Sequence, residues 1–109
     1  MAKRILAIDD MRECKGATVL ARTYQEGMDC LFKLGPWDEL WIDHDLGHKD
    51  PSGGREKTGY DILCSLEALW PVHRVDTIIL LTSNASGRLR MIQVMEQLKK
   101  FPHPLLGWK

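Results

Sequence analysis

Three short apolar segments of this chain each run into a cluster of polar residues. A nearly continuous apolar run of this kind is typical of a strand that is covered on both faces in a parallel sheet. Because all three runs end in acids, amides or hydroxyls, the pattern predicts an α/β fold with its chemistry at the strand ends. The segments are Ile5–Ile8 before Asp9-Asp10, Glu39–Ile42 before Asp43-His44-Asp45, and Thr77–Thr82, which continues into Ser83-Asn84.

Three amphipathic helices are expected to alternate with these strands. Thr23 and Glu26 have the spacing of a capping box, in which two side chains accept hydrogen bonds from backbone N–H groups of the first turn. Thr58 and Asp61 repeat that spacing at the start of a second helix. A third helix is expected to begin near Ser86-Gly87. Each segment carries apolar residues at helical spacing, which indicates one face packed on the sheet.

The remaining strand candidate, Thr18–Ala21, is weaker, and its orientation stays open. Only Met11–Gly16 separates it from Ile5–Ile8, whereas a parallel crossover usually needs a dozen or more residues. This strand is therefore either antiparallel or reached by a tight irregular link. In both cases we expect a mainly parallel four-stranded sheet in the order 2-1-3-4 with about three helices.

The composition is consistent with a single cytoplasmic domain spanning residues 1–109. Of the 109 residues 44% are hydrophobic, and 15 Lys and Arg balance 15 Asp and Glu. A domain of this size can bury a core, and the balanced charge excludes the global basic field of a nucleic-acid coat protein. No apolar run approaches the roughly 18 residues of a membrane-spanning helix. The three cysteines include no Cys-x-x-Cys pair, which favours a reducing compartment.

The polar strand ends predict a site for a divalent cation. Ligands of open α/β sheets bind beyond the carboxyl ends of the strands, where the acids of the first and third strands converge if those strands are neighbours. Unpaired carboxylates repel one another, so we expect a cation among them. Ligation by oxygen alone favours Mg²⁺ or Mn²⁺ over zinc. The alternative is that these acids only cap strands and helices on a solvated rim. The predicted ligands are Asp9, Asp10 and Asp43, with Asp45 as an outer or alternative ligand.

The same strand ends resemble the receiver domain of two-component response regulators. The resemblance implies that Asp9 and Asp10 bind Mg²⁺, that Asp43 accepts a phosphoryl group, and that Thr82 contacts the phosphate. This chemistry is consistent with the residue types, because a carboxylate can act as a nucleophile toward phosphorus while a metal bridges the oxygens. The matching segments are Leu6-Ala7-Ile8-Asp9-Asp10, Leu40-Trp41-Ile42-Asp43 and Leu80-Leu81-Thr82-Ser83.

The chain departs from a typical receiver domain in three places. It has no room for a helix between the first two strands, and residues 101–109 leave none for a fifth strand ending in Lys and a fifth helix. An insertion, residues 48–57, follows Asp45-Leu46-Gly47. The resemblance therefore implies a reduced receiver-like (flavodoxin-like) three-layer sandwich that lacks the first helix and the fifth strand and helix.

These departures resemble a narrower group, the small cyclic-phosphate-processing receiver domains associated with RNA repair and phage-borne genes. The resemblance covers nearly the whole chain and implies a bacterial or phage protein. Its most specific segments are Asp43-His44-Asp45-Leu46-Gly47 and Lys57-Thr58-Gly59-Tyr60-Asp61, with further matches at Ile8–Arg12, Ala21–Tyr24, Gly35–Glu39, Ser83-Asn84 and Gly87-Arg88.

Two classes of function follow from this resemblance and stay open. The first is a Mg²⁺- or Mn²⁺-dependent phosphoesterase or phosphotransfer domain acting on a phosphate-containing small molecule or an RNA end, such as a cyclic phosphate. Its expected catalytic residues are Asp43, His44 and Thr82. His44 is either a general acid or base or a packing residue beneath the loop. The second class is a non-catalytic receiver-derived module that binds a protein partner or a nucleotide through the same crevice.

Phosphate-binding groups are expected from two segments. Asn84 and Arg88 flank the start of the third helix, and a helix N-terminus with an Arg is a reasonable anion site, although ordinary capping is the alternative. Arg55 or Lys57 is expected to supply positive charge to the phosphate from the insertion, with residues 47–58 closing over the crevice when an anionic ligand binds. The alternative for this insertion is an exposed polar connector.

Overall fold

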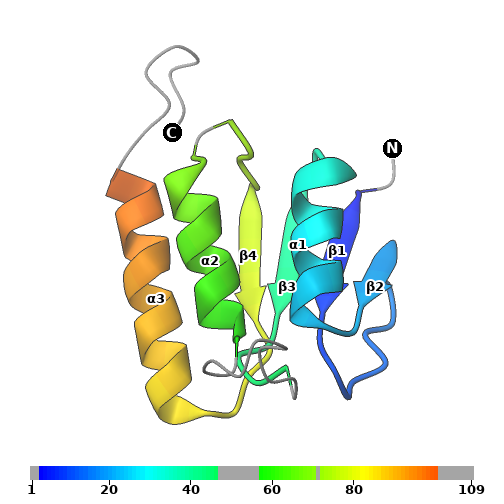
Figure 1. Cartoon of the computed structure of the whole chain (residues 1–109), viewed down its shortest axis with the longest axis horizontal. Coiled ribbons are helices and arrows are strands. Elements are labelled where there is room, and N and C mark those ends of the chain that lie inside the picture. Colours follow the sequence, from blue (N-terminus) through cyan, green and yellow to red (C-terminus); the bar gives the residue numbers. More distant parts are fainter. Residues whose placement is uncertain (1–2, 47–56, 71, 101–109) are drawn as a thin grey trace.

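The four strands form one parallel sheet in the order β2-β1-β3-β4, which confirms the predicted order (Figure 1). The computed structural model describes residues 3–46, 57–70 and 72–100. All three strand pairs are parallel, so the orientation that the sequence left open for the second strand is parallel. The strands are β1 (Ile5–Ile8), β2 (Val19–Ala21), β3 (Glu39–Ile42) and β4 (Thr77–Leu80).

The link from β1 to β2 achieves a parallel connection without a helix. Its backbone turns sharply at Cys14 and Gly16, whose φ angles of 52° and 95° lie in the left-handed region that favours glycine. The Thr18 N–H then donates to the Ile5 carbonyl at 2.8 Å, back at the amino end of β1. A Cβ on Gly16 would lie 3.5 Å from the Trp41 ring, so the link crosses the sheet over the β3 residue that points away from the core.

The three helices begin at the predicted capping residues or close to them. The Thr23 hydroxyl accepts from the Glu26 N–H at 3.0 Å, and the Asp61 carboxylate accepts from the Thr58 N–H at 2.8 Å. Each bond satisfies a backbone donor that a helix start would otherwise leave unpaired. The helices are α1 (Tyr24–Lys33), α2 (Gly59–Ala68) and α3 (Ala85–Lys100).

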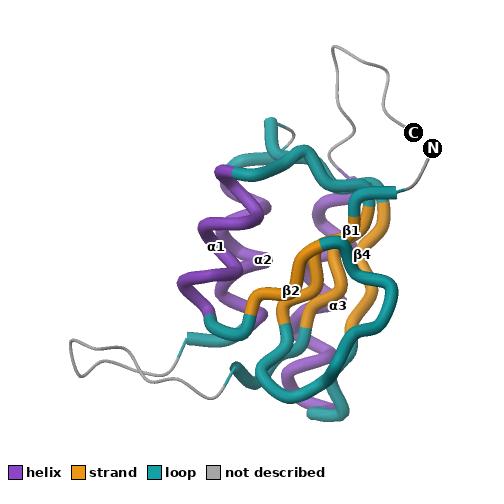
Figure 2. Tube along the Cα trace, turned by 90° about the vertical axis from the view of Figure 1, so that its right-hand side faces the viewer, coloured by secondary structure: helices purple, strands orange, loops and turns teal. Residues whose placement is uncertain are grey.

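The core lies between the sheet and the helices. Helices α1 and α2 lie on one side of the sheet, α3 packs on α2, and the β1–β2 link lies on the other side (Figure 2). Alternate strand residues face the helices, as a strand's period of two requires. The predicted reduced receiver-like α/β sandwich is thus confirmed, and among the described residues the β1–β2 link lies on the face of the sheet opposite α1 and α2. Core residues include Leu6, Ile8, Leu40, Ile42, Ile62, Leu66, Met91 and Leu98, each 2% exposed or less.

Strand β4 is shorter than the sequence predicts. It ends at Leu80 instead of Thr82, because its partner β3 ends at Ile42 and offers no further ladder position. The Leu81 N–H still donates to the Ile42 carbonyl at 2.9 Å, and the chain then leaves the sheet. Thr82 is therefore placed just beyond the strand end, beside the residues that follow β3.

In the described part of the chain, no helix has the length and apolarity needed to cross a bilayer.

Candidate metal and phosphate site

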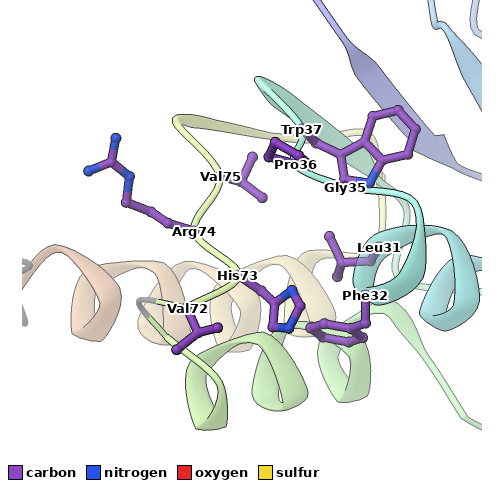
Figure 3. Close-up of a pocket in the computed structure, with 9 residues that line it drawn as sticks. All are labelled: Leu31, Phe32, Gly35, Pro36, Trp37, Val72, His73, Arg74 and Val75. Atoms are coloured by element: carbon purple, nitrogen blue, oxygen red, sulfur yellow. The ribbon is translucent and has the colours of Figure 1, made fainter.

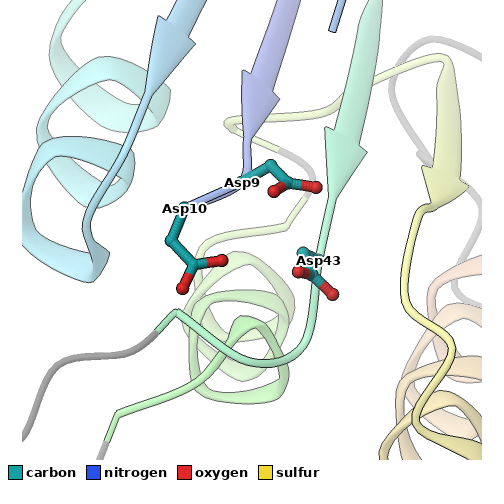
Figure 4. A group of neighbouring side chains, drawn as sticks. All are labelled: Asp9, Asp10 and Asp43. Carbon is teal, nitrogen blue, oxygen red and sulfur yellow. The ribbon is translucent and has the colours of Figure 1, made fainter. Parts of the chain in front are cut away.

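Three predicted metal ligands converge at the carboxyl ends of β1 and β3 (Figure 4). Ile8 pairs with Ile42 in the parallel register, so the residues that follow them, Asp9 and Asp43, lie side by side. The Asp43 N–H fixes this arrangement by donating to the Ile8 carbonyl at 2.9 Å. One carboxylate oxygen from each of Asp9, Asp10 and Asp43 lies within 4.8 Å of the others. We call these three residues the acidic trio.

Asp9 is fully buried and engaged by donors of its own loop. Its Oδ1 accepts from the Met11 N–H at 2.8 Å and the Arg12 N–H at 2.9 Å, and its Oδ2 accepts from the Arg12 guanidinium at 2.8 Å. Burial opposes ionisation of this carboxyl. The hydrogen bonds from Arg12 and Met11 outweigh that effect and hold the pKa of Asp9 below its ordinary value. Asp9 is therefore a charged, preorganised group.

Asp43 has the opposite electrostatic character. Burial raises the pKa of this carboxyl, the neighbouring charge of Asp9 adds to the effect, and a hydrogen bond from the His44 N–H at 2.8 Å only partly counters it. The Thr82 hydroxyl and Arg12 also favour the charged form. Two adjacent carboxyls whose pKa values are shifted in opposite directions are a feature of candidate functional sites.

Arg12 is a site residue that the sequence analysis did not identify. Its guanidinium bridges two members of the trio, at 2.8 Å from Asp9 Oδ2 and 3.4 Å from Asp43 Oδ2. The Arg22 guanidinium braces the same loop by donating to the carbonyls of Asp9 at 3.2 Å and Arg12 at 2.7 Å. Two signals in the sequence pointed to it: Arg12 ends the matching segment Ile8–Arg12, and it lies three residues after Asp9, on whose carboxylate the loop turns.

The structure places His44 and Asp45 beside α3. His44 Nδ1 lies 2.9 Å from Asp45 Oδ1, and the imidazole is buried with no hydrogen-bond partner for Nε2 among the described residues. The ring packs on Gly87, where a Cβ would come within 2.5 Å of it. Asp45 accepts from the Asn84 amide at 3.4 Å, and the pKa of Asp45 is lowered, chiefly by the hydrogen bond with His44. Asp45 is thus grouped with His44 and Asn84, and the acidic trio does not include it.

The residues after β4 have mainly local partners. Thr82 is 7% exposed, and its hydroxyl accepts from the Asn84 N–H at 3.0 Å. The Asn84 side-chain oxygen accepts from the Gly87 N–H at 2.9 Å, which makes Asn84 the N-cap of α3. The Arg88 guanidinium donates to the Leu80 carbonyl at 3.4 Å. Arg55 and residues 47–56 of the predicted closing loop lie outside the described residues.

We expect Asn84→Ala to lower the free energy of unfolding by about 1 kcal/mol, the usual cost of losing an N-cap. Asn84→Ser is the matched variant, because Ser can cap the helix but does not reach Asp45. Urea denaturation followed by circular dichroism measures both. Equal losses for the two variants would show that the contact with Asp45 matters more than the cap.

A pocket of about 360 Å³ lies at the opposite end of the sheet (Figure 3). The end of α1 and the segments leading into β3 and β4 line it, with Phe32, Trp37 and Val75 among its walls. The Trp37 indole N–H donates to the Cys30 carbonyl at 2.9 Å. Because these are the amino ends of the strands, the pocket is separate from the acidic trio.

A family model described as "cyclic-phosphate processing receiver domain" matches residues 4–97. The matched range contains all four strands, α1, α2 and most of α3, together with the acidic trio, Arg12, Thr82 and Arg88. The match confirms the resemblance seen in the sequence. No curated protein and no solved structure matches the chain significantly.

Proposed function

The chain belongs to the cyclic-phosphate processing receiver domain family, and we propose that its crevice binds Mg²⁺ or Mn²⁺ and processes a phosphate ester. A cyclic phosphate of an RNA end or of a nucleotide is the proposed substrate class. The acidic trio carries this proposal, because three carboxylates within 4.8 Å at one sheet edge offer a cation only hard oxygen ligands.

The trio is a suitable donor set for such a cation. Mg²⁺ usually takes one or two carboxylates and keeps its other positions for waters and substrate phosphate oxygens. Asp10 is half-buried, and Asp43 has one oxygen held by the His44 N–H and the other turned toward Arg12. Backbone hydrogen bonds fix the strand ends that carry these side chains, so little ordering is needed on binding.

A bound cation would supply Lewis-acid activation of a phosphoryl oxygen. In this proposal Asp43 acts as nucleophile or metal ligand, and the Thr82 hydroxyl, which favours the charged form of Asp43, contacts the phosphate. Asn84 and Arg88 are further proposed phosphate contacts at the start of α3. Asp45 is proposed as an outer ligand, and Arg55 as a phosphate contact from the insertion.

For His44 the geometry favours a positioning role over proton transfer. The imidazole is 6% exposed and lies against Gly87, which limits its access to a substrate at the trio. Its contact with Asp45 and the contact of Asp45 with Asn84 join the end of β3 to the start of α3. We therefore propose that His44 holds Asp45 and the α3 N-terminus in place beside the site.

The alternative is a non-catalytic module that binds a nucleotide or a protein partner through the same crevice. It uses the same metal site, so metal binding alone does not separate it from the enzyme. Turnover separates them, because only the enzyme converts the phosphate ester.

The proposal is tested by incubating the protein and Mg²⁺ or Mn²⁺ with 2′,3′-cyclic nucleotides and with RNA that ends in a 2′,3′-cyclic phosphate. We expect metal-dependent turnover that Asp43→Ala abolishes. Asp29→Ala is the matched control, since Asp29 is a half-buried acid that is paired with Lys33 on α1 and lies outside the acidic trio. Metal-dependent binding without turnover would support the binding module. Calorimetry that detects no metal binding at millimolar concentrations would overturn both.

A further inference from the structure

Among the described residues, the positively charged side chain of Arg12 already contacts the acidic trio. The Arg12 guanidinium donates to Asp9 Oδ2 at 2.8 Å and lies 3.4 Å from Asp43 Oδ2. The Asp9 side chain is fully buried and that of Asp43 is 10% exposed, whereas the Arg12 side chain remains 45% exposed. Arg12 therefore extends from solvent into a buried carboxylate pair.

We propose that Arg12 is the main phosphate-binding cation of this site, ahead of Arg88, and that it serves as a tethered counter-ion until a divalent cation replaces it. This inference rests on the proposed function, because it assigns a role at the same site. A metal ion on the same oxygens of Asp9 and Asp43 would repel the guanidinium, because both groups are positively charged. Metal binding therefore releases the guanidinium from at least one carboxylate, beside the position where the substrate phosphate meets the metal.

The geometry of the link supports this role. Arg22 anchors the backbone at Arg12 by donating to the Arg12 carbonyl at 2.7 Å, and Asp9 Oδ1 accepts from the Arg12 N–H at 2.9 Å. The backbone of Arg12 is therefore fixed, while its long, exposed side chain can change rotamer. A planar guanidinium also binds two phosphate oxygens at once, which a lysine ammonium does not do.

Other described groups are less well placed to supply this charge. The Lys that ends the fifth strand of a typical receiver has no counterpart among residues 3–46, 57–70 and 72–100. Arg88 donates to the Leu80 carbonyl and Arg22 donates to two carbonyls of the β1–β2 link. In this chain the positive charge enters from the link that stands where a typical receiver has its first helix.

The inference predicts opposite effects of one substitution on two ligands. Arg12→Ala removes the competitor for Asp9 and Asp43, so Mn²⁺ should bind severalfold more tightly than to the wild type. The same variant loses a charge-assisted contact to phosphate, so 2′,3′-cyclic AMP and inorganic phosphate should bind the Mn²⁺-loaded protein about tenfold to a hundredfold more weakly. For both Mn²⁺ and phosphate, the affinity of Arg12→Lys should lie between those of the wild type and Arg12→Ala.

Isothermal titration calorimetry measures Mn²⁺ first and then each phosphate probe at saturating Mn²⁺. Arg74→Ala is the matched control, because it removes an ion-paired arginine at the opposite end of the sheet, and it should change neither affinity. Circular dichroism checks the fold, and Arg12→Gln replaces Arg12→Ala if the latter fails to fold.

If Arg12→Ala binds both Mn²⁺ and the phosphate probes with the same affinities as the wild type, this inference is wrong and the proposed function still stands. Weaker Mn²⁺ binding in Arg12→Ala would also overturn it, because the guanidinium would then support the metal site. If neither probe binds the Mn²⁺-loaded wild type, the phosphate role of Arg12 is wrong. A wild type that binds no metal would instead overturn the proposed function itself.

Discussion

Gly59→Ala is expected to lower the free energy of unfolding by about 3 kcal/mol, a large effect for one methyl group. A Cβ at residue 59 would run into the backbone carbonyl of Asp43 and approach within 3.1 Å of Ile42 Cγ1. The obstructing group is backbone, and the Gly59 N–H is itself bonded to the His44 carbonyl at 2.8 Å. Neither segment can move away without displacing the end of β3, so the acidic trio should lose its geometry together with stability.

Gly27→Ala is the matched control for this prediction. A Cβ at Gly27 would also be crowded, at 2.9 Å from Cγ2 and Cδ1 of Ile8 and 3.2 Å from Cδ1 of Ile62, but these are side-chain atoms, and moving them costs less than moving the backbone of Asp43. Alanine is favoured over glycine inside a helix by about 1 kcal/mol, which offsets part of the crowding. Urea denaturation should show a much smaller loss for Gly27→Ala, and Mn²⁺ titration should show weakened binding only for Gly59→Ala. Equal losses would mean that the end of β3 adapts to the methyl group.

The sheet and the trio were predictable because short-range patterns determine both. Ile5–Ile8 and Glu39–Ile42 read as buried strands, and the acids that follow them must meet wherever those strands pair in parallel. Capping residues such as Thr23 and Thr58 act through bonds to N–H groups three residues away, so their spacing in the sequence is enough to predict where a helix begins. The parallel orientation of β2 was less accessible, because it depends on left-handed turns at Cys14 and Gly16.

The electrostatic partner of the trio was not predictable in the same way. From the sequence, positive charge is expected from Arg55 in the insertion and from Arg88 at a helix start. The structure instead brings Arg12 to the acids, through a turn that Asp9 itself stabilises by accepting from two backbone N–H groups. That turn has no repeating pattern, so neither the period of two residues typical of strands nor the period of 3.6 typical of helices indicates it in the sequence. The separation of Asp45 from the trio has a similar cause, because β3 has ended at Ile42 and strand alternation no longer applies.

The two buried carboxyls of the trio should affect stability in opposite directions with pH. In the metal-free protein the pKa of Asp9 is lowered by folding, so its charged form stabilises the fold above the ordinary pKa, and this contribution is lost as the pH falls through the lowered pKa. Folding raises the pKa of Asp43, so its charged form opposes folding at neutral pH. That penalty disappears as the pH falls through the raised pKa, since the carboxyl then takes up a proton.

Asparagine substitutions should therefore separate stability from metal binding. In metal-free buffer at pH 7 we expect Asp9→Asn to lower the free energy of unfolding by about 1–3 kcal/mol, because a buried charge-assisted bond to Arg12 is lost. Asp43→Asn should instead raise the melting temperature, since the amide oxygen still accepts from the His44 N–H without the cost of a buried charge. Both variants should bind Mn²⁺ at least about tenfold more weakly, because each loses an anionic ligand.

Measuring Asp43→Asn and the wild type at several pH values tests whether the buried charge causes the difference in stability. The advantage of Asp43→Asn over the wild type should shrink as the pH is lowered, because the protonated wild-type carboxyl resembles the amide. Asp29→Asn, at a half-exposed side chain of α1, should leave both the melting temperature and Mn²⁺ binding nearly unchanged. A destabilised Asp43→Asn would mean that Arg12 already compensates the Asp43 charge in full. If Asp43→Asn is stabilised as expected, the buried charge of Asp43 lowers the stability of the metal-free protein, and a divalent cation that binds at the trio offsets this electrostatic cost.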